Sequence, residues 1–178
     1  MKSKVLAISA IAAGFVAITL TLGAYIQFID LFMLAVSSVF VILPLYYKSY
    51  KGCVMTFLAG GTIALLCSLP TITFSIVFPT YAAFFGLYPI VRHFTRDKNL
   101  NKYLCYIIGM VWCVAAVYGL YFYYTAVIGL NFSDLPYWVA DYILYLLAPA
   151  GIVFYIIYDR YVIVVKFLLD KLLGRILK

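Results

Sequence analysis

The sequence predicts an all-α integral membrane protein, a bundle of six transmembrane helices with both termini in the cytoplasm and a C-terminal amphipathic helix. The chain has 178 residues, of which 67% are hydrophobic and only 11% are charged. Such a chain has too little polar surface to cover a water-soluble globule. Its apolar runs are long enough to cross a bilayer. With six crossings, all thirteen Lys and Arg residues fall on one side, as the positive-inside rule requires for the cytoplasm.

The segment Arg92 to Lys102 is the only long polar interruption in the middle of the chain, and it holds four of the thirteen basic residues. We expect it to be a cytoplasmic loop whose charges are solvated and have no binding role. Because the basic residues flank membrane-length runs, the net charge of +7 is read as a signal of topology. No nucleic-acid partner is implied.

Three helices are predicted in the first part of the chain. Residues 5–22 follow Lys2 and Lys4 and lack the small-x-small pattern of a cleaved signal, so they are expected to be the first spanning helix. The second helix is predicted over Asp30 to Tyr47 and the third over 53–69. The third contains Gly60-Gly61, whose cost in helix propensity indicates a close helix contact or a bend.

Three more helices follow. The fourth is predicted over 72–91, where Pro79 frees a backbone carbonyl that needs a partner at membrane depth. The fifth is predicted over 103–124. The sixth begins near Asp134, a candidate cap, and reaches about residue 158. We therefore divide the chain into a six-helix transmembrane domain, 1–158, and a basic cytoplasmic amphipathic helix, 159–178, in which Asp159 lies on the polar arc.

The first helix has one face almost without bulky side chains. Small residues recur there every four positions, with a second row offset by one: Ser9, Ala13 and Ala17, then Ala10 and Gly14. Such a face allows another helix to approach closely, which is a main source of helix association in lipid. Two alternatives remain open, a packing surface within this bundle or a docking surface for a separate subunit.

Three of the six carboxylates lie in the predicted outer half, where no basic residue can pair with them. Asp30 and Asp134 are expected to cap helices. Asp141 lies seven residues beyond Asp134, or about 10 Å along the sixth helix, which puts it below the headgroups. Because a carboxylate within the membrane is costly, it predicts a binding site for a small molecule.

Aromatic residues gather at the same outer ends. They predict either an interfacial belt or a cage for a cationic or flat aromatic ligand, and the belt accounts for most of the rings. Asp141 and Trp138 are the predicted ligand contacts. The full predicted substrate-binding set is Asp141, Trp138, Tyr137, Tyr142, Tyr145, Tyr121 and Asp30.

The sequence does not indicate an enzyme. It contains no Glu, no nucleophile-His-acid arrangement on one side, no H-E-x-x-H motif and no glycine-rich phosphate loop. No cofactor or metal is expected. The four cysteines occur singly within apolar runs and are expected to be small buried hydrophobic residues: Cys53, Cys67, Cys105 and Cys113.

The layout resembles the substrate-binding S components of energy-coupling factor (ECF) vitamin transporters. The resemblance rests on the six-helix size, the small-residue first helix, the outer aromatic mouth and the absence of an energy-capturing motif. It implies a membrane subunit that binds a vitamin or similar small molecule and is driven by a separate T component and two ATPases. It also implies that Ala13 and Ala17, with Ser9 in place of an alanine, meet the T component.

Two other functions remain open. One is a structural membrane scaffold, similar to the MreD-like cell-shape proteins, in which the helices and basic tail hold partners. The other is a secondary carrier that acts alone, although no strong internal repeat supports it. All three alternatives place the protein in the cell membrane.

Overall fold

The computed structural model describes residues 3–68, 74–98, 101–127, 129 and 137–176, with the backbone alone for 27, 74–75, 102, 137–141 and 173–176. Every regular element in these ranges is a helix, which confirms the predicted all-α class. The helices, which include short 3-10 turns and one π-helical segment, are α1 (Ser3–Tyr25), η1 (Gln27–Ile29), α2 (Asp30–Ile42), η2 (Leu43–Tyr47), α3 (Tyr50–Ser68), α4 (Phe74–Thr80), η3 (Tyr81–Gly86), α5 (Leu87–Asp97), α6 (Lys102–Ala126) and α7 (Tyr137–Ile176).

Within the described residues, four helical stretches are long and apolar enough to cross a membrane. They are α1, α2 together with η2, α3, and Tyr103–Ala126 of α6. Their outward faces carry large apolar side chains, such as Ile11 on α1 and Leu58 on α3, each more than half exposed. The chain is thus a membrane protein with several helices suited to lipid.

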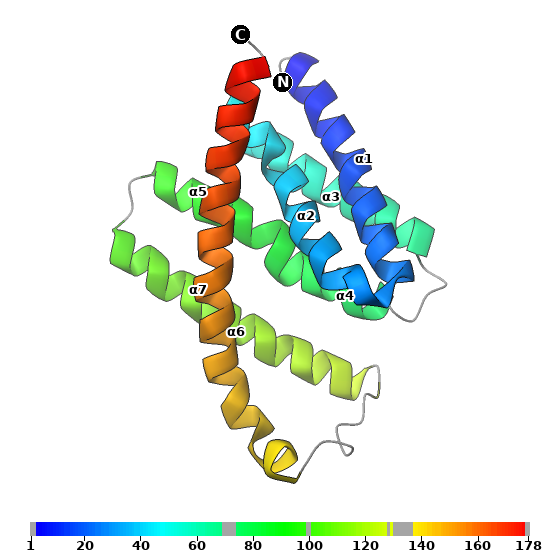
Figure 1. Cartoon of the computed structure of the whole chain (residues 1–178), viewed down its shortest axis with the longest axis vertical. Coiled ribbons are helices and arrows are strands. Elements are labelled where there is room, and N and C mark those ends of the chain that lie inside the picture. Colours follow the sequence, from blue (N-terminus) through cyan, green and yellow to red (C-terminus); the bar gives the residue numbers. More distant parts are fainter. Residues whose placement is uncertain (1–2, 69–73, 99–100, 128, 130–136, 177–178) are drawn as a thin grey trace.

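The N-terminal half is organised around α1, which packs along both α2 and α3 (Figure 1). Ala12 and Val16 of α1 are fully buried, and the α3 backbone comes close to them at Gly60. A Cβ atom on Gly60 would lie 2.6 Å from Val16 Cγ1 and 3.0 Å from the carbonyl of Ala13. The glycine pair predicted to allow close contact therefore does so, with Gly60 at the α1 interface.

The segment α4, η3 and α5 forms one helical path with a π-helical turn at Tyr81–Gly86 (Figure 1). Pro79 precedes this turn, and the Ile76 carbonyl beside it accepts hydrogen bonds from Thr80 Oγ1 at 2.8 Å and from the Tyr124 hydroxyl at 3.0 Å. Through the Tyr124 hydroxyl, this proline-containing turn of α4 is tied to α6. The predicted loop start at Arg92 is wrong, because α5 continues to Asp97.

The C-terminal half consists of α6 and α7, which pack against each other. Helix α7 runs without interruption through residues 158 and 159 and contains Pro149. In Figure 1 it extends along most of the molecule, and α6 crosses it. Its later part also reaches α2, where the Tyr161 hydroxyl donates to the Ala35 carbonyl at 2.9 Å.

An aromatic core lies where η3, α5 and α7 meet. Phe85 of η3 packs edge-on against Tyr158 of α7, with ring centroids 5.0 Å apart, and Tyr88 of α5 lies 5.5 Å from the same ring. Phe84 and Phe154 make a similar contact at 5.1 Å. Buried ring pairs of this kind stabilise contacts beyond the area they bury. This core fixes the position of α7 beside α5.

Candidate functional site

A buried ion pair joins α5 to α7 and was not predicted from the sequence. Asp159 is 2% exposed, and its Oδ1 accepts from Arg92 Nε while its Oδ2 accepts from Arg92 Nη2 at 3.3 Å. The Tyr88 hydroxyl also donates to Oδ1, at 2.6 Å. Three charge-assisted hydrogen bonds therefore satisfy a carboxylate that the surrounding residues remove from water. The expected place of Asp159 on a polar, solvated arc is wrong.

Arg92 is likewise not part of a solvated loop. Its side chain is 12% exposed, and its guanidinium carbon lies 5.2 Å from the centre of the Tyr106 ring on α6. Burial acts to lower the pKa of Arg92, but the hydrogen bond and charge of Asp159 outweigh burial and raise that pKa above its ordinary value. One turn further on, Arg96, Asp97 and Lys98 are exposed, as predicted.

His93, the only histidine in the chain, is buried beside this pair. Neither ring nitrogen has a hydrogen-bond partner. Burial, followed by the positive charges of Lys166, Arg96 and Arg92, lowers its pKa to about 4. The imidazole is therefore neutral at physiological pH. The Tyr50 hydroxyl of α3 donates to the His93 carbonyl at 3.2 Å and to Asp97, which holds α3 against α5.

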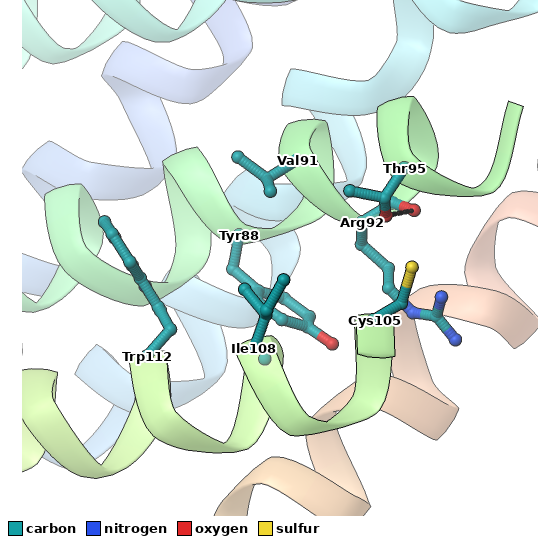
Figure 2. A pocket seen from close by; sticks show the side chains of 8 residues that line it. Tyr88, Val91, Arg92, Thr95, Cys105, Ile108 and Trp112 are labelled. Atoms are coloured by element: carbon teal, nitrogen blue, oxygen red, sulfur yellow. Dashed lines mark hydrogen bonds between the residues drawn. The ribbon is translucent and has the colours of Figure 1, made fainter. Parts of the chain in front are cut away.

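A cavity of about 80 Å³, which we call the α5–α6 slot, lies beside Arg92 between those two helices. It is lined by Tyr88, Val91, Arg92, Thr95, Cys105, Ile108, Gly109 and Trp112. Figure 2 shows Trp112 towards one end of the slot and Arg92, Thr95 and Cys105 towards the other. Ligand pockets for drug-sized molecules are typically about 300–1,000 Å³, so this slot is too small for a vitamin.

The predicted docking residues of the first helix divide into two groups. Ser9, Ala13 and Ala17 are buried, and α3 approaches this face: the Thr56 hydroxyl donates to the Ser9 carbonyl at 3.2 Å. Ala10 is exposed and Gly14 is half-buried with no neighbour near its Cα hydrogens. In this conformation the inner row thus serves packing within the bundle, while the offset row faces outward.

An open apolar groove runs between α1 and α3 beside that offset row. It has a volume of about 360 Å³ and is lined by Leu6, Ser9, Ala10, Ala13, Met55, Leu58 and Ala59. We call it the α1–α3 groove. Its floor is made of small residues, so a helix from another chain could approach the backbone closely there.

The predicted substrate site is only partly within the described residues. The side chains of Tyr137, Trp138 and Asp141 lie outside them, as does Asp134. Tyr142 and Tyr145 are exposed, with ring centroids 6.4 Å apart, and Tyr121 packs against Phe122 at 5.7 Å. The structure thus brings Tyr142 and Tyr145 together on α7.

Asp30 does not cap α2 as predicted, because Ile29 is the residue before the helix and Asp30 is the first residue within it. Its carboxylate accepts from the Leu31 backbone N–H, and its charge is favourable in the first turn of a helix.

The cysteines give a mixed result. Cys53, Cys105 and Cys113 are buried as expected, whereas Cys67 is exposed near the end of α3. The prediction was wrong for Cys67. Among the described residues, no group of three His, Cys, Asp or Glu side chains could hold a metal ion.

The sequence contained one usable signal for the ion pair. Asp159 is one of only six acidic residues, and it directly follows an apolar run that ends at Tyr158. An acid at that position in a chain with thirteen basic residues needs a partner, but the sequence could not indicate which one. No family model, curated protein or solved structure matches the chain.

Proposed function

We propose that this protein is the membrane-embedded substrate-binding subunit of an uptake transporter for a vitamin or similar small molecule, energised by a separate ATPase module. The observation that carries the proposal is the α1–α3 groove, because it gives the first helix a small-residue surface on which a transmembrane helix of a partner subunit fits.

The proposed topology has six spans with both termini in the cytoplasm. To the four apolar helices it adds the α4–η3–α5 path as far as Val91, which leaves the rest of α5 outside the lipid, and the first part of α7. Two arrangements support it. The connections after η2 and α5 and the later part of α7 carry basic residues, whereas the described helix ends at Tyr25, Ser68 and Ala126 carry none. In Figure 1 the basic ends lie towards the top and left of the molecule. The helix ends without basic residues lie towards the right and bottom.

The proposed partner surface is formed by the exposed Ala10 and Ala59 in the α1–α3 groove, with Leu6 and Leu58 among its lining residues. Leu6 and Leu58 are both more than half exposed. In lipid, exposed leucines alone give little drive for association, but small residues between them allow close backbone approach. The proposed occupant is a helix of the membrane subunit that couples the protein to its ATPases.

The proposed substrate side is the outer mouth formed by the first turns of α7 and the end of α6. Asp141 and Trp138 are the proposed contacts to a cationic or flat aromatic solute, with Tyr142 and Tyr145 around them. The exposure of those two tyrosines supports an open mouth on this side. It also suits an interfacial belt.

Purification in mild detergent tests the proposal. We expect a membrane subunit and ATPase subunits to co-purify with the wild-type protein, and a vitamin from a panel to quench tryptophan fluorescence. Ala10→Phe fills the groove and should abolish co-purification. Ile11→Phe is the matched control, because Ile11 is exposed on α1 but does not line the groove. Recovery of the same partners with both variants would contradict the proposed surface.

A second candidate function, the structural scaffold, is favoured by a second groove on another helix pair. This α6–α7 groove, of about 310 Å³, is lined by Met110, Val111, Val114, Ala115 and Ile152. Two separate apolar grooves on different helix pairs suit a protein that holds two helical partners at once. Recovery of cell-wall synthesis proteins without ATPases, and their loss in Val111→Phe, would support the scaffold instead of the transporter.

A further inference from the structure

We propose that the α5–α6 slot binds one acyl chain of an anionic phospholipid, whose phosphate is held at the Arg92 end. This site lies at the opposite end of the α5–α6 pair from the outer mouth, and it does not depend on the proposed transport function.

The dimensions of the slot suit a hydrocarbon chain. From Cys105 to Trp112 the lining follows α6 for seven residues, or about 10 Å. A volume of about 80 Å³ leaves room for a short length of one chain and for no bulky solute. Val91 and Ile108, on the two sides, are each about half exposed, so the slot opens towards the lipid.

Trp112 forms the apolar end of the slot. Its indole Nε1 donates to the Ala83 carbonyl in the π-helical turn, at 3.0 Å. Because this hydrogen bond uses the only polar atom of the side chain, the ring is left as an apolar wall. The π-helical turn therefore fixes the wall against which a chain would lie.

Arg92 forms the polar end. A guanidinium has five N–H donors, and the contacts with Asp159 use two of them. The remaining donors can reach a phosphate oxygen, for which Arg is well suited. The exposed Arg96 on the same helix and Lys98, which directly follows that helix, add positive charge, and Asp97 is the only acid on α5. Basic pockets between helices on the cytoplasmic side commonly hold anionic headgroups.

The polar and apolar ends of the slot are arranged like the headgroup and the acyl chain of a phospholipid. Arg92 directly follows the predicted fourth span, which puts it at headgroup depth in the proposed topology, and Trp112 lies at the other end of the slot, near the middle of α6. Thr95 and Cys105 share the end with Arg92, whereas the remaining wall is hydrocarbon or aromatic apart from the Tyr88 hydroxyl, which is bonded to Asp159. A polar head and an apolar tail are thus both accommodated in the correct orientation.

Tryptophan quenching tests the proposal. The chain has two Trp residues, so Trp138→Phe leaves Trp112 as the single tryptophan, which is excited selectively over the tyrosines. The full-length variant is reconstituted in phosphatidylcholine vesicles that contain phosphatidylglycerol or phosphatidylcholine with brominated chains. We expect the anionic lipid to quench Trp112 at about fivefold lower mole fraction, which is the effect of one cationic side chain near an anionic headgroup. Equal quenching by both lipids would overturn the proposal and indicate bulk lipid only.

Variants in this background separate the two ends of the slot. Asp159→Asn frees the guanidinium and should increase the preference for the anionic lipid. The double variant Arg92→Gln with Asp159→Asn removes both charges and should reduce the preference to about one. Ile108→Phe narrows the slot and should reduce quenching by either lipid, whereas Ile107→Phe, exposed on α6 but outside the lining, should not.

Two controls complete the experiment. Size-exclusion profiles identify any variant that is not folded, and the Ile108 and Ile107 pair keeps the test decisive if the charge variants fail. Added inorganic phosphate should not relieve quenching. If millimolar phosphate abolishes the lipid preference, the site binds a free anion and the proposed lipid occupant is wrong.

Discussion

Arg92 and Asp159 are separated by 67 positions along the chain, and both are removed from water when α5 meets α7. Two charges taken out of water are costly, and their attraction repays that cost only with good geometry and additional hydrogen bonds. Here Tyr88 supplies one such bond and Tyr106 lies near the guanidinium. The pair therefore specifies which turn of α7 lies against α5.

Replacing Asp159 alone should show how much an unpaired Arg92 destabilises the protein. Asp159→Asn leaves a partly buried guanidinium without its counter-charge, and we expect a loss of about 3–5 kcal/mol in stability. Thermal unfolding in detergent measures it. Asp170→Asn, an exposed acid on the same helix, is the control and should change stability by less than about 0.5 kcal/mol. Equal effects of the two substitutions would show that the ion pair contributes nothing specific.

His93 predicts a dependence of stability on acid pH. The folded protein holds the imidazole neutral with a pKa of about 4, whereas an unfolded histidine titrates near 6.5. The protein should therefore have its full stability above about pH 6.5 and lose about 3 kcal/mol as the pH falls from there to 4. The facing charged and titratable groups are Tyr50, Arg92, Arg96, Asp97 and Lys166.

Unfolding midpoints at pH 7.5 and 5.0 check this prediction. The decrease in the unfolding midpoint between pH 7.5 and pH 5.0 should largely disappear in His93→Leu, since the chain has no other histidine. If His93→Leu retains the same decrease, other groups cause it.

The contact between helices α1 and α3 depends on glycines, which have no side chain to keep the two backbones apart. Gly60 lies against Val16 and Ala13, and Gly52 lies where a Cβ would be 2.8 Å from Ser9 Oγ. In lipid, such close backbone approach replaces the hydrophobic drive that water supplies to soluble proteins. The two helices are therefore held by shape more than by apolar area.

Gly60→Ala should consequently destabilise the protein although alanine is the better helix former. The added Cβ would lie 2.6 Å from Val16 Cγ1, and overpacking of this kind costs about 1–3 kcal/mol. The matched control is Gly14→Ala on α1, where the added Cβ meets nothing within 4 Å and should be neutral or stabilising. Melting temperatures in the same detergent compare them, and similar values for both variants would contradict close packing at Gly60.

Helix boundaries were predictable wherever composition changed sharply. The α1, α3 and α6 limits fall within a few residues of the predicted ones, because apolar runs end there in polar or turn residues. The end of α5 was mispredicted because Arg92 to Asp97 read as loop by charge alone. The charge pattern along α5 does not show that Arg92 pairs with Asp159 on α7. The ion pair and the slot beside it could therefore be found only in the structure.

At the scale of the whole molecule, charge distribution gives a topology that labelling can check. In a cysteine-free variant, Lys98→Cys should resist a membrane-impermeant thiol reagent added outside intact cells and react after lysis. Phe28→Cys, at a fully exposed position in the first connection, should react from outside. The expected difference reflects the positive-inside rule. Labelling of Lys98→Cys from outside would invert or remove the proposed topology.

Helix α7 has 40 residues in one uninterrupted element, which corresponds to a rod about 60 Å long. A bilayer with its headgroups is only about 40–45 Å thick. In the proposed topology, in which the first part of α7 crosses the bilayer, the helix therefore extends past the lipid on at least one side.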